Sequence, residues 1–233
     1  MNRPDSNRRD HHRDAVYPSP FHSRQKAHNR MREWSRWSDY LSVPAYWCAD
    51  MEYFAGRNAT GVFDITPMVK HRISGPDALP YLQRLMTRDV SKIKPGRVGY
   101  SVWCDDNGQV IDDGTIFHLE EGVYRICSQE HQLDWFLANA EDFDVRVEDE
   151  THDVAALALQ GPTSCAVLKQ LGLPGIENLT PFGIARFELP AGALLIVEQH
   201  VLGGDVSLPD WLDDQLARRG AETLSSRPAP GCR

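Results

Sequence analysis

Along residues 69–171, the spacing of apolar residues changes repeatedly between the period of a strand and the period of a helix. This pattern constrains the fold more than any other feature of the sequence. Apolar and polar residues alternate over residues 69–73, which predicts a strand. Apolar residues at helical spacing then predict a helix over residues 78–86, whose first turn tolerates Pro80 if Asp77 caps it. The same patterns predict further strands over residues 98–104, 110–119, 123–127, 143–147 and 154–159, and helices over 133–140 and 162–171.

Short turn signals connect several of these strands. Asp105-Asp106-Asn107-Gly108 and Glu120-Glu121-Gly122 each separate two strand-like segments, which is typical of hairpins. Strict alternation of strand and helix is absent, so a dinucleotide-binding fold is not expected. The pattern predicts an α+β fold, with antiparallel sheets and helices on one side.

Charge is spread unevenly along the 233 residues, whose formal net charge is −8. Residues 1–37 hold nine basic and four acidic residues, so the rest of the chain is strongly acidic. An acidic body argues against nucleic acid as a partner, because phosphate recognition needs a basic face. We interpret residues 1–30 as a disordered basic tail, either solvated or touching an anionic surface, and expect order to begin near Trp34.

The apolar runs and the cysteines of the sequence indicate the cellular compartment of the protein. The longest apolar runs, 154–159 and 193–197, are much shorter than the roughly 20 residues that a membrane span needs. The polar first residues do not resemble a secretory signal. Five cysteines, an odd number without a Cys-x-x-Cys pair, fit a reducing compartment. We therefore expect a cytoplasmic protein with no membrane partner.

Most common catalytic signatures are missing from the sequence. No phosphate-binding loop, GxGxxG, HExxH or GxSxG motif occurs. Several of the nine histidines lie in the polar N-terminal region, and we expect no metal site. Cys127 and His131 would suit a nucleophile pair only on one helix, and Cys127 lies at the end of an expected strand.

Two adjacent carboxylates, Asp112 and Asp113, interrupt the apolar strand expected over residues 110–119. Neighbours on a strand point to opposite faces, so one carboxylate can face solvent while the other enters the interior of the sheet. A carboxylate in the interior costs several kcal/mol unless it is paired or functional. The alternative is a bulge or turn, where Asp-Asp-Gly is common.

Six short blocks occur in order between residues 58 and 172. They are Gly61-Val-Phe-Asp-Ile-Thr-Pro-Met68, Ile73-Ser-Gly-Pro-Asp77, Leu85-Met-Thr-Arg-Asp-Val90, Lys94-Pro-Gly-Arg-Val-Gly-Tyr100, Asn107-Gly-Gln-Val-Ile-Asp-Asp113 and Leu157-Ala-Leu-Gln-Gly-Pro162. The ordered set resembles the aminomethyltransferase (glycine-cleavage T-protein) family. It is most similar to the broader branch that includes demethylases, because Thr66-Pro67 stands where the glycine-cleavage protein usually has Ser-His.

The resemblance implies an activity and a site. It implies tetrahydrofolate as cofactor and transfer of a one-carbon unit from a small methylated or aminomethylated donor. It also allows for a carrier or partner protein. The catalytic carboxylate would be Asp113, and we expect its loss to matter far more than that of Asp112. The resemblance places Met68, Tyr100 and Phe117 around the pterin, and Ser128 near the position of a pocket asparagine. A thioether and two flat rings suit a flat heterocycle.

The resemblance ends near residue 197. It implies a folate-binding region over residues 31–197 and a divergent tail over 198–233, because Glu198–Leu208 does not match the tyrosine- and glutamate-bearing segment expected there. Two hypotheses follow from this departure. One is a one-carbon transferase or its N-terminal fragment. The other is a catalytically inactive folate-family scaffold or a truncated, frameshifted gene product. Either way, a site lacking part of its wall is expected to bind folate weakly.

Overall fold

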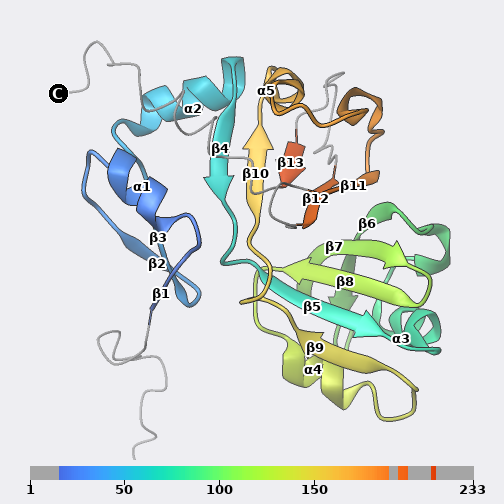
Figure 1. Cartoon of the computed structure of the whole chain (residues 1–233). Helices are drawn as coiled ribbons and strands as arrows, with labels where there is room; N and C mark the ends of the chain where they lie inside the picture. The colour runs from blue at the N-terminus through green and yellow to red at the C-terminus, as the bar shows by residue number, and fades with distance from the viewer. Residues whose placement is uncertain (1–15, 189–193, 199–210, 214–233) are drawn as a thin grey trace, which may run out of the picture.

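A computed structural model describes residues 16–188, 194–198 and 211–213 of the chain. Its largest sheet has five antiparallel strands in the order β6-β7-β8-β5-β9 (Figure 1). The strands are β5 (Val69–Ser74), β6 (Arg97–Cys104), β7 (Val110–Glu120), β8 (Val123–Ser128) and β9 (Arg146–Asp149). Helices α3 (Ala78–Leu85) and α4 (Leu133–Ala138) and the short 3-10 helix η1 (Val90–Lys92) accompany this sheet.

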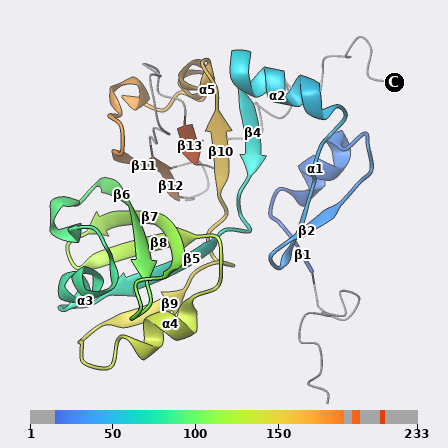
Figure 2. The same ribbon diagram turned by 180° about the vertical axis from the view of Figure 1, so that it is seen from behind.

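The remaining elements form three smaller units. An antiparallel sheet has the order β13-β10-β4, made of β4 (Gly61–Asp64), β10 (Leu157–Gln160) and β13 (Trp211–Asp213), with α5 (Ser164–Gln170) and η2 (Ile176–Asn178) following β10. A hairpin pairs β11 (Ile184–Glu188) with β12 (Leu194–Glu198). The N-terminal segment holds β1 (Tyr17–Pro18), α1 (His22–His28), β2 (Ser35–Trp37), β3 (Tyr40–Ser42) and α2 (Ala49–Asn58). Both ribbon views show this segment beside β4 (Figures 1 and 2).

The expected α+β class with antiparallel sheets is confirmed, and most expected elements lie where the periods predict them. Two strands are shifted. The chain turns at Phe143, whose N–H donates to Ala140 O, so β9 begins at Arg146 instead of residue 143. Val154 N–H donates to Glu150 O in another turn, so β10 begins at Leu157 instead of residue 154.

The expectation of a disordered tail through residue 30 is wrong for residues 16–30. Helix α1 lies within that range, and its Gln25 is buried because the side-chain Nε2 donates to Asp64 Oδ2 on β4 at 2.6 Å. Ser19 Oγ donates to the same carboxylate oxygen at 2.5 Å. Polar contacts with a distant strand therefore order a segment whose composition is that of a solvated tail.

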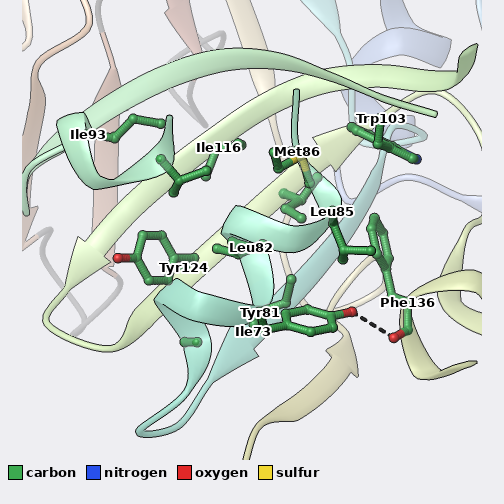
Figure 3. Close-up of a cluster of buried hydrophobic side chains, with 13 residues drawn as sticks. Ile73, Tyr81, Leu82, Leu85, Met86, Ile93, Trp103, Ile116, Tyr124 and Phe136 are labelled. Atoms are coloured by element: carbon green, nitrogen blue, oxygen red, sulfur yellow. Dashed lines mark hydrogen bonds between the residues drawn. The ribbon is translucent and has the colours of Figure 1, made fainter. Parts of the chain in front are cut away.

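The main core lies between one face of the five-stranded sheet and helices α3 and α4 (Figure 3). Leu82 and Leu85 of α3 pack against Ile116 of β7 in the same buried cluster. Tyr81 carries its hydroxyl into this core and donates to Phe136 O at 2.6 Å, a bond drawn in Figure 3. The helices therefore cover one face of the sheet. On the other face Phe117 is buried with residues of the hairpin region, whereas Tyr100 is exposed.

Asp77 does not cap α3 with its side chain as expected. Its Oδ2 accepts from Asp144 N–H at 2.9 Å, so this carboxylate ties the start of α3 to the turn before β9. Pro80 still lies in the first turn of the helix, where a missing N–H costs no hydrogen bond. Among the helices of the described residues, none is long and apolar enough to cross a membrane.

Candidate functional site

The hairpin of β6 and β7 brings Tyr100 and Asp113 together. Val102 pairs with Asp113 and Tyr100 pairs with Thr115, so Tyr100 and Asp113 are diagonal neighbours on the same face of the sheet. The Tyr100 hydroxyl donates to Asp113 Oδ2 at 2.5 Å. Tyr100 is 46% exposed although it lies in the middle of a strand, and Asp113 is exposed as well. An oriented carboxylate beside a flat ring therefore faces solvent.

The pair is electrostatically coupled. The hydrogen bond to the Asp113 carboxylate is the main cause of a raised pKa for the Tyr100 hydroxyl. The phenol therefore stays protonated and keeps donating, which leaves the second carboxylate oxygen of Asp113 available to a ligand.

Asp112 points to the opposite face of the same strand. It is buried, with 8% exposure, and its two oxygens accept from backbone N–H groups: Oδ1 from Asp113 at 2.8 Å and Oδ2 from Glu130 at 3.1 Å. The sequence left open which carboxylate enters the interior, and the structure assigns this position to Asp112. Because backbone donors satisfy it, Asp112 holds the loop after β8 in place.

Gly114 lies where the backbone of β7 passes close to the backbone of β8. A Cβ atom built there would lie 2.3 Å from Cys127 O and 3.3 Å from the Trp103 ring. Only glycine allows this approach without displacing backbone. The Asp-Asp-Gly sequence therefore lies in strand β7 and not in a turn, and it directly follows a bulge: Trp103 pairs with Asp112 and Cys104 pairs with Val110, so Ile111 has no paired residue on β6.

The other expected site residues, Met68, Phe117 and Ser128, differ in burial and in the face of the sheet on which they lie. Met68 directly precedes β5 and is half-buried; extending the strand alternation by one residue puts it on the face of Asp113. Phe117 shares that face, but it is buried against Phe182 and Ile184 of the hairpin region. Ser128 is 1% exposed and pairs with Gly114, which puts it on the face of Asp112, where its Oγ donates to Glu130 O at 3.2 Å.

Charged side chains that the sequence pattern did not single out continue the open face beyond Asp113. Phe117 pairs with Arg125, which in turn pairs with Arg72, so these three residues share a face. Glu150 joins the two arginines, accepting from Arg125 Nε at 2.8 Å and from Arg72 Nη1 at 3.4 Å. In the sequence, Arg72 alternates with more apolar neighbours, and this alternation predicts that its side chain points away from the core.

Cys127 and His131 do not form a nucleophile pair on one helix. Cys127 lies in β8, whereas His131 follows the strand and lies 3.3 Å from Ser38 Oγ and 3.7 Å from Asp39 Oδ2. Within the described residues, no group of three or more histidine, cysteine or acidic side chains could hold a metal ion.

The fold and the site together define an α+β protein with an oriented carboxylate on the open face of an antiparallel sheet. The family model described as the GCVT N-terminal domain matches residues 21–186, more than half of the chain. The chain therefore belongs to this family, and the match includes α1, which precedes the six sequence blocks of residues 58–172.

Curated relatives agree with this family. The chain is 39% identical over 124 residues to an aminomethyltransferase from Lysinibacillus sphaericus, covering 52% of this chain and 34% of the relative. It is 31% identical over 159 residues to an aminomethyltransferase from Bacillus pumilus, covering 66% of this chain and 44% of the relative. The chain thus spans between a third and a half of the length of these relatives.

The fold is also similar to that of solved structures. The crystal structure of glycine cleavage system aminomethyltransferase T from Bartonella henselae superimposes with a TM-score of 0.72 at 21% identity. The superposition covers 91% of this chain and 58% of the other. At this identity the likeness concerns the fold alone.

Proposed function

We propose that this chain binds tetrahydrofolate at the open face of its five-stranded sheet and takes part in folate-dependent one-carbon transfer, with Asp113 as the catalytic carboxylate. The observation that carries the proposal is the exposed Asp113 carboxylate held by the Tyr100 hydroxyl. The matched family and the aminomethyltransferase names of its relatives support the class of reaction.

The residues on this face suit a reduced pterin. The Tyr100 ring offers a flat apolar surface, and Met68 offers a polarisable thioether on the same face. Asp113 can accept hydrogen bonds from the N–H groups of such a ring. We place Phe117 beside these groups on the same face and Ser128 on the opposite face of the sheet. Both are buried, so they support the site without contacting the ligand in this arrangement.

Tetrahydrofolate, when bound, supplies the nucleophilic nitrogen that receives the carbon. Asp113 orients that nitrogen and accepts its proton as the new bond to carbon forms, which is general-base work for a fixed carboxylate. Tyr100 acts through Asp113, because its hydroxyl fixes one carboxylate oxygen and leaves the other to face the ligand. The donor heteroatom, if it is cationic in the donor as an ammonium nitrogen is, would depart as a neutral group with the electrons of its bond to carbon.

We further propose a small methylated or aminomethylated molecule as the donor, presented either free or by a carrier protein. The similar structure from Bartonella henselae is described as part of the glycine cleavage system, which favours a partner protein. We propose a cytoplasmic location, for which the odd number of cysteines without a Cys-x-x-Cys pair is the support.

Calorimetric titration of the chain with tetrahydrofolate tests the proposal. A charged hydrogen bond contributes about 1.5–3 kcal/mol, so Asp113→Asn should weaken binding by roughly 10- to 100-fold. Asp106→Asn is the matched control, because Asp106 is an exposed aspartate in the turn between β6 and β7. Equal affinity of the Asp113 and Asp106 variants would remove Asp113 from the site.

A transfer assay separates the two functional hypotheses. With a one-carbon donor and tetrahydrofolate, an enzyme loses roughly 100-fold or more in rate when its general base is removed by Asp113→Asn. A scaffold that only binds folate shows affinity without turnover in both forms.

A further inference from the structure

A buried lysine lies on the same face of the five-stranded sheet as the candidate site. Lys70 of β5 pairs with Cys127, which pairs with Thr115. Thr115 pairs in turn with Tyr100, so these four residues form one row across four strands. Directly paired residues share a face, and this is the face that carries Asp113. The row therefore contains both the exposed ring of Tyr100 and a lysine of which only 2% is exposed.

The ammonium group of Lys70 turns back along its own strand. Its Nζ atom donates to Met68 O at 2.7 Å and to Thr66 O at 3.0 Å. An ammonium group is costly to bury, so its hydrogen bonds decide where the side chain lies. The backbone of the lysine is fixed as well, because its N–H donates to Thr151 Oγ1 at 3.1 Å and its carbonyl oxygen accepts from Glu150 N–H at 2.8 Å. Lys70 therefore ties the segment before β5 to the sheet.

The two carbonyl groups flank Pro67 in a turn that needs support from outside. Met68 N–H donates to Ile65 O at 3.0 Å, which makes Thr66 and Pro67 the central residues of the turn. The peptide bonds of this turn are trans. A trans proline is disfavoured at the second central position of a common turn, because it keeps the preceding residue out of the helical region. Lys70 binds carbonyl groups on both sides of Pro67 and so stabilises a turn that its own backbone favours weakly.

The turn sets the position of Met68. The Met68 N–H closes the turn, its carbonyl oxygen accepts from Lys70, and its half-buried side chain lies on the face of Asp113. Thr66 is anchored from another side, because its Oγ1 donates to Ala156 O at 3.3 Å and accepts from Ala156 N–H at 3.2 Å. With Thr66 held in this way, the hydrogen bond from Lys70 fixes the other end of the turn, where Met68 lies.

We propose that Lys70 is a positioning residue for the folate site. Its ammonium group fixes Met68 and, through Met68, the thioether that packs on the pterin of tetrahydrofolate. The inference rests on the proposed function, because it takes the open face of the sheet as the folate site. Lys70 itself is buried and does not contact the ligand. Without the ammonium group, Met68 samples several positions, and the ligand must order it on binding, which weakens affinity.

Lys70→Met keeps the length of the side chain and removes the ammonium group. In the ligand-free variant, the Met68 methyl resonance should move and broaden, while that of Met86 in the core stays in place. Tetrahydrofolate binding, measured by calorimetry, should weaken about tenfold, the effect of losing one charged hydrogen bond. Lys94→Met is the matched control, because the exposed Lys94 also donates to a backbone carbonyl oxygen, that of Ser91. The control should change neither the resonances nor the affinity.

A double-mutant cycle separates positioning from a general loss of stability. In a Met68→Ala background, Lys70→Met should change the tetrahydrofolate affinity less than twofold, because the lysine acts through Met68. An equal tenfold loss in both backgrounds, or an unmoved Met68 resonance in Lys70→Met, overturns the proposal.

Two provisions keep the outcome decisive. Circular dichroism reports whether Lys70→Met folds; if it does not, Lys70→Gln, which can still donate to one carbonyl oxygen, replaces it with the same expected outcomes. If the wild-type chain does not bind tetrahydrofolate, the proposed function fails. The Met68 resonance of the ligand-free variant then still decides whether Lys70 fixes that residue.

Discussion

His71 is expected to make the stability of this protein fall as the solution becomes acidic. The residue lies in β5 with no exposed surface, its ring meets Phe136 edge-on, and neither ring nitrogen has a hydrogen-bond partner among the residues that the structure describes. Burial lowers the pKa of His71 from 6.5 to about 4, an effect that the nearby Asp149 opposes and His131 reinforces. Between pH 6.5 and about pH 4, the ring is therefore mostly neutral in the folded protein and mostly protonated in the unfolded chain.

The pKa shift sets the size and the sign of the effect. One pKa unit corresponds to about 1.4 kcal/mol, so a shift from 6.5 to about 4 amounts to roughly 3 kcal/mol in full. The unfolded state binds more protons between these two values, so stability is lost as the pH falls from 6.5 towards 4. About 2 kcal/mol of it should disappear between pH 7 and pH 5.

Urea unfolding of the wild-type chain and of His71→Leu at pH 7 and pH 5 measures this effect. The variant replaces with apolar atoms two ring nitrogens that find no partner within the described part of the chain, so at pH 7 it should be about as stable as the wild type or more so. The wild type should lose about 2 kcal/mol more than the variant on acidification. Equal losses in the wild type and His71→Leu would refute the reasoning.

Two further predictions concern the strand that carries the site. Asp112→Asn leaves the backbone N–H of either Asp113 or Glu130 facing an amide NH₂ instead of an oxygen. The variant should lose roughly 1.5–3 kcal/mol of stability, measured by urea unfolding. A variant within 0.5 kcal/mol of the wild type would contradict the buried role of Asp112. Gly114→Ala places a Cβ atom 2.3 Å from Cys127 O and should cost roughly 1–3 kcal/mol, measured by the shift in thermal midpoint, and an unshifted midpoint would contradict the close approach of β7 and β8.

Much of the fold is predictable from the sequence because its strands and helices differ clearly in period. The strand at residues 69–73 and the helix at 78–86 were expected from local pattern and occur as β5 and α3. The pattern also showed that Asp112 and Asp113 must point to opposite faces. It could not show which is buried, because that depends on the backbone N–H of Glu130, which the next hairpin brings close.

Long-range polar contacts order the N-terminal segment, which its local composition does not predict. Ser19 and Gln25 both donate to Asp64, roughly forty residues further along the chain, and no local pattern reveals that partner. Lys70 is a similar case: it alternates with apolar residues, yet it is buried because its Nζ donates to the carbonyl oxygens of Thr66 and Met68. Polarity alone therefore misplaces residues whose hydrogen bonds are supplied by a distant side chain or by nearby backbone carbonyl groups.

The central claim is that tetrahydrofolate binds on the face of the sheet that carries Tyr100 and Asp113, and methionine-methyl NMR tests it most directly. The chain has five methionines. Met68 lies on that face, whereas Met86 is buried in the core on the other side. We predict that tetrahydrofolate shifts the Met68 methyl resonance in a saturable way, that the Met86 resonance stays in place, and that Asp113→Asn weakens the response by tenfold or more. A Met68 resonance that does not move while tetrahydrofolate binds elsewhere would contradict the claim.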